Sequence, residues 1–295
     1  MPVEPPIETP ATLAEALTVL AGSTPDAPIA PIAGGTDLMV RITGEIGEPP
    51  GRLVDLSRIA ELRGIASDGD AIVLGAATTY TDIRRSDVCR EHLPALVEAA
   101  ATIGAAQIQN RGTLGGNIAN ASPAGDTLPV LLALDAEIHV GARRGERVIA
   151  ASDFWVAYRR TALAPDELIL RIRIPISGGR EARFRKIGTR RAQAISKVVL
   201  ALSWREAIDG PEPRSRIGWR DVRLGLGSVA DRPIRARATE AVLEGASPTP
   251  QTADAAAEAL AAEIQPIDDV RSTAEYRRAV AARALHRMIR DAGGW

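Results

Sequence analysis

The chain of 295 residues has a single cysteine, Cys89. One cysteine forms no disulfide within the chain, and it cannot hold an iron–sulfur cluster, because such a cluster needs several thiolate ligands. The three histidines, His92, His139 and His286, share no spacing typical of metal ligands, so we expect no metal site. This cysteine usage is typical of a reducing compartment, and we expect a cytoplasmic protein.

Long apolar runs and blocks of like charge are absent as well. A membrane span needs an apolar run of about 18 residues or more, and the sequence has none. The N-terminus, MPVEPPIETP, lacks the basic and apolar regions of a signal peptide. The 36 basic and 37 acidic residues leave a net charge of −1 without a cluster of one sign, which disfavours nucleic acid as a partner.

Aromatic residues make up only 3% of the chain, so we expect a core built from Ala, Val, Leu and Ile. The periodicity of these apolar residues predicts the secondary structure. Predicted helices cover residues 9–22, 93–103, 126–134, 252–264 and 272–289. Predicted strands cover residues 29–33, 52–56, 71–76, 136–141, 147–151, 168–176, 198–207 and 221–229, with 136–141 and 147–151 forming a hairpin. Strands with interspersed helices, then a small sheet with terminal helices, are typical of an α+β fold.

We place a domain boundary at Gly178-Gly179, where a glycine pair follows the long strand 168–176. The expected domains are residues 1–177 and 178–295.

The first motif that carries chemistry is Ala33-Gly34-Gly35-Thr36-Asp37-Leu38. A strand that runs into two glycines exposes backbone N–H groups with no Cβ in the way, and such groups form an anion-binding concavity. The Thr36 hydroxyl adds a donor. A tight turn, followed by a renewed apolar run over residues 38–42, is the structural alternative for this motif taken alone.

The second motif is Thr113-Leu114-Gly115-Gly116-Asn117, followed by Ser122-Pro123-Ala124-Gly125-Asp126. We expect residues 111–117 to be a loop. The Asp126 carboxylate suits a ribose diol, although taken as a lone residue it favours the cap of the helix that starts at Thr127. Two polar glycine loops roughly eighty residues apart predict a shared ligand, such as a dinucleotide whose pyrophosphate needs donors from both sides.

Two further stretches resemble functional motifs. Residues 225–230, GLGSVA, match the G-x-G-x-x-A pattern of dinucleotide-binding folds, but Asp231-Arg232-Pro233 follows in place of a helix, so we interpret them as the end of a strand. The basic stretch 184–198 contains both lysines of the chain, Lys186 and Lys197, whereas arginine is used everywhere else. Because ammonium and guanidinium groups are not interchangeable, this placement indicates a specific contact for Lys186.

Together these stretches resemble the FAD-binding medium subunit of the xanthine dehydrogenase and carbon monoxide dehydrogenase family of molybdenum hydroxylases. The family signature A-G-G-T-D-L, T-x-G-G-N and S-P-x-x-D is matched in order, and residues 184–198, 230–234 and 269–278 resemble its later stretches. The resemblance implies a two-lobed FAD-binding domain of the PCMH type and a smaller α+β C-terminal domain.

The resemblance also implies a non-covalent FAD site. Asp126 would hold the adenosine ribose, Ile169 would pack near the adenine, and Ile103 and Lys186 would lie near the flavin ring. The pyrophosphate would be held by Pro31, Ile32, Ala33, Gly34, Gly35, Thr36, Asp37, Leu38, Thr113, Leu114, Gly115, Gly116 and Asn117. We expect no catalytic residue, because no acid–base pair or nucleophile stands out.

The remaining redox centres, molybdopterin and [2Fe-2S] clusters, would then belong to a large and a small partner subunit, assembled as a dimer of heterotrimers. Electrons would pass from the iron–sulfur centres through FAD to an external acceptor: NAD, oxygen or a quinone. Two alternatives stay open from the residues alone. One is a free-standing FAD-dependent oxidoreductase of the same fold, and the other is a non-catalytic adaptor.

Overall fold

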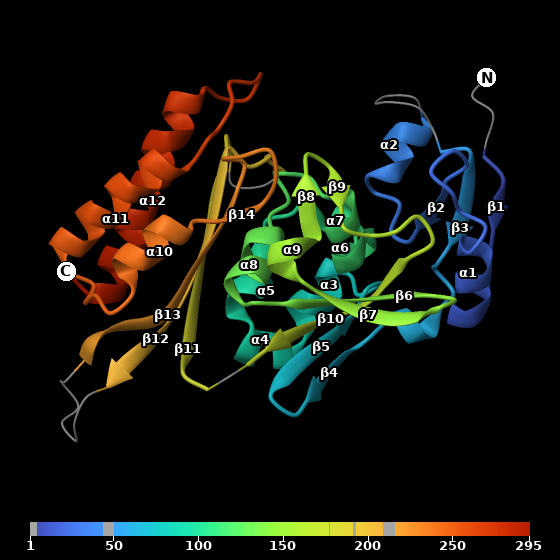
Figure 1. Ribbon diagram of the computed structural model, residues 1–295, viewed down its shortest axis with the longest axis horizontal. Coiled ribbons are helices and arrows are strands. Elements are labelled where there is room, and N and C mark those ends of the chain that lie inside the picture. Colours follow the sequence, from blue (N-terminus) through green and yellow to red (C-terminus); the bar gives the residue numbers. More distant parts are fainter. Residues whose placement is uncertain (1–4, 44–49, 177, 191–192, 209–215) are drawn as a thin grey trace.

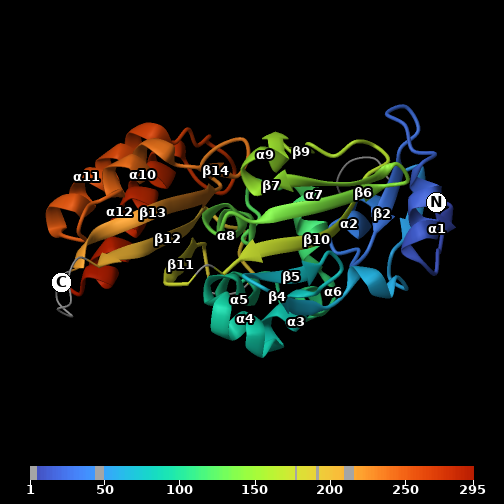
Figure 2. The same cartoon turned by 60° about the horizontal axis from the view of Figure 1, so that its bottom comes forward.

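The computed structural model describes residues 5–43, 50–176, 178–190, 193–208 and 216–295. The chain forms three bodies in a row, with the N-terminal lobe at one end and the C-terminal helices at the other (Figures 1 and 2). Helices and strands are largely segregated within each body, so the predicted α+β class is confirmed. Three clusters of buried apolar side chains are centred on the three bodies. The cluster of the middle lobe extends to Phe184, Val199 and Ala201 of the C-terminal sheet.

The N-terminal lobe is a three-stranded parallel sheet, in the order β1-β3-β2, with α1 packed beside it. Helix α1 starts later than predicted, because Thr12 accepts the N–H of Glu15 as the N-cap. The apolar run 38–42 is a short helix. The elements are β1 (Ile7–Glu8), α1 (Leu13–Leu20), β2 (Ile29–Ile32), α2 (Leu38–Ile42) and β3 (Arg52–Asp55).

The middle lobe is built on a five-stranded antiparallel sheet in the order β4-β5-β10-β6-β7. The predicted hairpin is confirmed as β6 paired with β7, and the predicted long strand is β10 at the centre of the sheet. Its elements are η1 (Ala60–Leu62), β4 (Ile65–Asp68), β5 (Ala71–Gly75), α3 (Tyr80–Arg85), α4 (Asp87–His92), α5 (Pro94–Ala101), α6 (Ala106–Arg111), α7 (Leu114–Asn120), α8 (Leu128–Ala133), β6 (Glu137–Ala142), β7 (Gly145–Ala150), α9 (Ala151–Phe154), β8 (Trp155–Ala157), β9 (Arg160–Thr161) and β10 (Leu168–Pro175).

The C-terminal body is a four-stranded antiparallel sheet, β11-β12-β13-β14, with three helices against one face (Figure 2). Strand β11 was not predicted, because only Phe184 of its eight residues is fully buried and the apolar alternation is lost. Its elements are β11 (Arg180–Ile187), β12 (Val198–Ile208), β13 (Arg216–Gly227), β14 (Ile234–Arg235), α10 (Arg237–Leu243), α11 (Pro250–Glu263) and α12 (Ala274–Gly293). Residue 177, at the expected domain boundary, and the 209–213 connection lie outside the described residues.

The prediction of a loop over residues 111–117 is wrong. Helix α6 ends at Arg111, and α7 begins at Leu114 with Thr113 as its N-cap, whose side chain accepts the N–H of Gly116. Two glycines in the first turn weaken the local signal for a helix. Tertiary contacts stabilise it, because the Gly115 N–H donates to the Ala76 carbonyl oxygen over 2.8 Å.

The GLGSVA segment is confirmed as the end of strand β13. Its glycines serve close packing, because helix α8 lies directly on the strand. A Cβ on Gly225 would be 2.1 Å from the Pro129 carbonyl oxygen, and a Cβ on Gly227 would be 2.9 Å from the Pro123 carbonyl oxygen. The pattern therefore arises from contact between the middle lobe and the C-terminal sheet.

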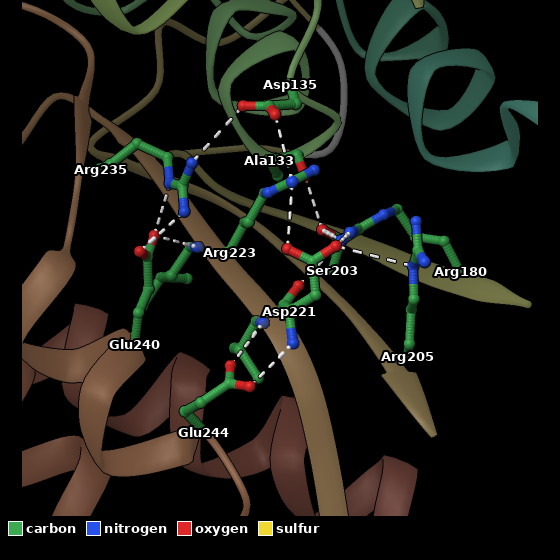
Figure 3. Close-up of polar contacts among 12 residues, drawn as sticks. Ala133, Asp135, Arg180, Ser203, Arg205, Asp221, Arg223, Arg235, Glu240 and Glu244 are labelled. Atoms are coloured by element: carbon green, nitrogen blue, oxygen red, sulfur yellow. Dashed lines mark hydrogen bonds and ion pairs between the residues drawn. The ribbon is translucent and has the colours of Figure 1, made fainter. Parts of the chain in front are cut away.

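Polar contacts add to this docking at the C-terminal end of α8 (Figure 3). The Ser203 hydroxyl donates to the Ala133 carbonyl oxygen over 2.6 Å. Asp135, in the turn after α8, pairs with Arg223 at 3.1 Å and lies 3.7 Å from Arg235. Arg235 also pairs with Glu240 of α10 at 2.6 Å. The C-terminal sheet is thus tied to the middle lobe by packing and by charge, and this fixes the wall of the cavity described below.

We predict that Gly225→Ala lowers the free energy of unfolding by about 1–3 kcal/mol, since the added methyl has no space against the α8 backbone. Gly51→Ala is the matched control, because a Cβ there meets nothing within 4 Å, and its effect should stay within about 0.5 kcal/mol. Urea unfolding of the two variants beside the native chain measures the difference. Equal effects of the two substitutions would refute the packing role of Gly225.

Candidate functional site

The two glycine motifs meet in space, although they are far apart in sequence. The first lies between β2 and α2, and Gly35 has φ +75°, a conformation that glycine adopts without strain. Gly34 packs against the end of α6: a Cβ on it would lie 1.9 Å from the Arg111 carbonyl oxygen. Only glycine allows this approach of backbone to backbone, so the first turn sits directly against the second motif.

The two motifs differ in which backbone donors they leave free. The N–H groups of Gly34, Gly35 and Thr36 donate to no acceptor in the described parts of the chain. In α7, by contrast, the N–H groups of residues 114–117 donate to Thr78 O, Ala76 O, Thr113 Oγ1 and Thr113 O. The first turn therefore offers the free donors that an anionic group requires. The second motif packs beside this turn and holds it in place.

Two cavities adjoin this contact. The turn cavity, of about 220 Å³, is lined by residues 31–38 together with Arg41, Tyr80, Thr113, Gly116, Asn117, Ala119 and Asn120. The interdomain cavity, of about 690 Å³, lies between the middle lobe and the C-terminal body. Residues that line both cavities are Thr36, Asp37, Tyr80, Asn117 and Asn120. The two cavities therefore adjoin each other, and together they form the cleft.

A buried ion pair crosses the interdomain cavity from one body to the other. The Lys186 ammonium of β11 lies 2.6 Å from Asp126 Oδ2 and donates to the Thr102 carbonyl oxygen over 3.0 Å. Both side chains are less than a tenth exposed. The Ser196 hydroxyl donates to the other carboxylate oxygen, Asp126 Oδ1. Burial raises the pKa of the Asp126 carboxyl, and the nearby Lys186 charge opposes that shift.

The alternative of Asp126 as a helix cap is wrong. Helix α8 begins at Leu128, Thr127 is its N-cap, and no side chain caps the helix. Both carboxylate oxygens of Asp126 face Lys186 and Ser196 instead. The specific contact expected for Lys186 is therefore with Asp126 and the Thr102 carbonyl.

Most of the predicted site residues line the cleft, and three do not. Pro31 to Leu38, Thr113, Gly116 and Asn117 line the turn cavity, and Ile103, Asp126 and Lys186 line the interdomain cavity. Leu114, Gly115 and Ile169 are buried and line neither cavity. A Cβ on Gly115 would lie 2.7 Å from the Ala76 carbonyl oxygen, so this glycine serves packing.

Sequence reasoning missed several polar residues of the cleft. Asn120 donates to Asp37 Oδ1 over 2.9 Å and accepts from Arg159 over 2.9 Å. Burial raises the pKa of the Asp37 carboxyl, and the Arg159 charge opposes it. Asn120 lies three residues after Asn117, on the same side of helix α7. The loop predicted over residues 111–117 does not indicate this helical spacing.

Arg277 closes the C-terminal wall of the interdomain cavity. Its guanidinium donates to the carbonyl oxygens of Lys197 and Ser228 and to Asp269 Oδ1, at 2.6 to 3.0 Å. Arg277 is 4% exposed. Both Asp269 and Arg277 belong to the C-terminal stretch that carried the resemblance, but their contact with the cavity follows only from the fold.

A glycine turn with free N–H donors, beside a cleft between two bodies, is typical of a protein that binds a phosphate-bearing cofactor such as a dinucleotide. The comparisons with known proteins agree with this class. The family described as "FAD binding domain in molybdopterin dehydrogenase" matches residues 3–177, and that described as "CO dehydrogenase flavoprotein C-terminal domain" matches residues 183–292.

Relatives match over nearly the whole chain. The nicotine 6-hydroxylase medium subunit of Paenarthrobacter nicotinovorans is 34% identical over 89% of either chain. The xanthine dehydrogenase FAD-binding subunit of Escherichia coli O157:H7 is 30% identical over 96% of either chain. Among solved structures, a chain of carbon monoxide dehydrogenase from Hydrogenophaga pseudoflava matches with a TM-score of 0.89 and 30% identity, over 97% of this chain and 96% of that one.

This chain belongs to the family of FAD-binding subunits of molybdopterin dehydrogenases. It is an oxidoreductase subunit, and its cofactor is FAD. Across the described residues, no three or more His, Cys, Asp or Glu side chains gather in a group that could hold a metal ion. No helix among those residues is long and apolar enough to cross a membrane.

We predict that Asp126→Asn lowers the free energy of unfolding by about 3–5 kcal/mol, because it leaves the Lys186 ammonium buried without a carboxylate. The double variant Asp126→Asn with Lys186→Met should recover most of this loss, since it removes both charges. The matched control is Glu146→Gln, whose partner Arg171 is 40% exposed, and it should cost at most about 1 kcal/mol. If the double variant is as unstable as the single one, the loss does not come from the unpaired charge.

Proposed function

We propose that this chain holds FAD non-covalently along the cleft and passes electrons between partner subunits and an external acceptor. The observation that carries the proposal is the free N–H donors of Gly34, Gly35 and Thr36, three residues that line the turn cavity beside the larger interdomain cavity. None of the described residues lining the two cavities is a histidine or cysteine, which supports a cofactor without a covalent tether.

The free donors of the first turn fit the pyrophosphate, with the other lining residues of 31–38 and with Thr113, Gly116 and Asn117 around it. Leu114 and Gly115, which line neither cavity, would position helix α7. Ile169 would support the cavity wall through the core, since it lines neither cavity.

The ion pair revises one assignment. The resemblance implied that Asp126 holds the adenosine ribose and that Lys186 reaches the flavin ring, and these groups are at opposite ends of FAD. Because the two side chains are in contact at 2.6 Å, they act at the same place. We propose that both, with Ile103, lie at the flavin end, in the larger cavity.

We further propose two domains, residues 1–177 and 178–295. The two family descriptions match residues 3–177 and 183–292, which supports a boundary between strands β10 and β11. The flavin end would lie between the two domains, so Lys186 would join the C-terminal domain to the cofactor.

The proposed complex contains a small iron–sulfur subunit and a large molybdopterin subunit, as a dimer of heterotrimers in the cytoplasm. The words "medium subunit" in the name of the relative from Paenarthrobacter nicotinovorans support partners of this kind. FAD, when bound, supplies the conversion between one-electron and two-electron transfer that such a chain of centres needs. The residues of this chain would bind the cofactor, orient it and exclude water from its buried side.

A free-standing flavoenzyme is the alternative. Against it, two carboxylates that line the interdomain cavity are paired with cations of the chain, Asp126 with Lys186 and Asp269 with Arg277. The carboxylates of Asp126 and Asp269 are therefore occupied by cations of this chain, whereas a free-standing enzyme needs an available base for a substrate carbon.

The purified chain should carry FAD that acid or heat releases intact, or should take up added FAD with a flavin absorption spectrum. FMN should bind more weakly, because it lacks the adenosine half and one phosphate. A colourless chain that takes up no added FAD would contradict the cofactor assignment.

The isolated chain, loaded with FAD, should not be reduced by the organic substrate of the complex. Chemically reduced flavin on the chain should still reduce an artificial dye, and addition of both partner subunits should restore reduction by substrate. Stopped-flow absorbance of the flavin measures each step. Rapid flavin reduction by an organic substrate in the isolated chain would favour the free-standing enzyme.

A further inference from the structure

Tyr80 lies where the turn cavity opens into the interdomain cavity, and it lines both. It is the first residue of α3, directly after the N-cap Thr79. The side chain is fixed on one side by Gly112, where a Cβ would lie 2.9 Å from Tyr80 Cε2. The Tyr80 N–H donates to the Gly112 carbonyl oxygen over 3.2 Å. Gly112, directly before the second glycine motif, thus holds the Tyr80 ring in one position.

The Tyr80 hydroxyl has no hydrogen-bond partner among the described residues, although the residue is only 3% exposed. The hydroxyl oxygen is not fully enclosed by protein, so it is open to the cavities that Tyr80 lines. A hydroxyl that is buried overall, open to a cavity and unpartnered needs a partner from whatever fills that cavity. Burial raises the pKa of this phenol, with further upward shifts from the charges of Asp37 and Asp126, so the group remains a proton donor.

The charges around Tyr80 decide which part of the cofactor reaches it. The free N–H donors for phosphate lie at one side, in the turn cavity, and Lys186 lies at the other. The carboxylates of Asp37 and Asp126 act on Tyr80 itself, and they would repel a phosphate but accept hydrogen bonds from hydroxyl groups. No described residue donates to Asp37 Oδ2, while Asn120 occupies Oδ1.

We propose that the Tyr80 hydroxyl and the Asp37 carboxylate form the subsite for the ribityl chain of FAD. Tyr80 donates a hydrogen bond to one ribityl oxygen, and Asp37 accepts one from a ribityl hydroxyl. The ribityl chain is the polyhydroxyl segment that joins the flavin ring to the pyrophosphate, so it is the part of the cofactor that must pass this junction. The inference rests on the proposed FAD site. It adds Tyr80 to that site, and it assigns Asp37 to the ribityl chain and not to the pyrophosphate.

The test compares two ligands on the cofactor-free chain by calorimetric titration. FAD contains the ribityl chain, whereas ADP contains the same pyrophosphate and adenosine without it. Tyr80→Phe keeps the ring against Gly112 and removes only the hydroxyl. We expect this variant to bind FAD about threefold to tenfold more weakly, as for one lost neutral hydrogen bond, and to bind ADP as the native chain does. Tyr276→Phe is the matched control, because Tyr276 lines neither cavity, and it should change neither affinity.

A second measurement locates the contact within the chain. FAD analogues that lack one ribityl hydroxyl each are titrated against both proteins, and one analogue should lose affinity for the native chain and show no further loss with Tyr80→Phe. Unchanged FAD affinity in Tyr80→Phe would overturn the ribityl contact. Equal losses for FAD and ADP would overturn it too, since they would place the hydroxyl at a phosphate or report a damaged fold. A native chain that binds ADP but not FAD, or neither, fails the proposed function itself.

Discussion

The cleft depends on one steric constraint, the approach of backbone to backbone at the two glycine motifs. Gly34 lies against the Arg111 carbonyl, and Gly115 lies against Ala76, with no space for a Cβ at either place. The first contact joins the turn after β2 to the end of α6, and the second joins α7 to the end of β5. Because the protein satisfies the donors of α7 itself, the N–H groups of the first turn are the ones left for a ligand.

The second constraint is the ion pairing between the middle lobe and the C-terminal body. Lys186 belongs to the strand at the edge of the C-terminal sheet, and its buried ammonium finds its carboxylate, Asp126, on the middle lobe. The ionic contacts of Asp135 with Arg223 and Arg235 hold the same two bodies together further from the cleft (Figure 3). An unpaired charge at the buried Lys186–Asp126 pair would be costly, so the electrostatics of the site and the docking of the two bodies are coupled.

The glycines show how local motifs gain different roles in the fold. Gly35 supplies a positive φ, Gly34 and Gly115 supply space for a neighbouring backbone, and Gly225 supplies space for helix α8. All four occur in short patterns that suggest phosphate binding. Only the turn with Gly34 and Gly35 leaves its donors unsatisfied, so the hydrogen-bond inventory, rather than the glycine pattern, distinguishes a binding turn from a packing contact.

The sequence by itself determined the α+β class, the β6–β7 hairpin, the long strand β10, the terminal helices and the segments that line the cleft. These features depend on apolar period and on ordered motifs, which a single chain displays directly. The tertiary structure alone decided that residues 114–120 are helical, that Asp126 pairs with Lys186, and that Tyr80 and Asn120 enter the cleft. The reason is physical: Asp126 and its partner Lys186 are 60 residues apart, and Asn120 and Asp37 are 83 residues apart. The other outcomes depend on the packing of a distant backbone, and no local pattern encodes such a partner.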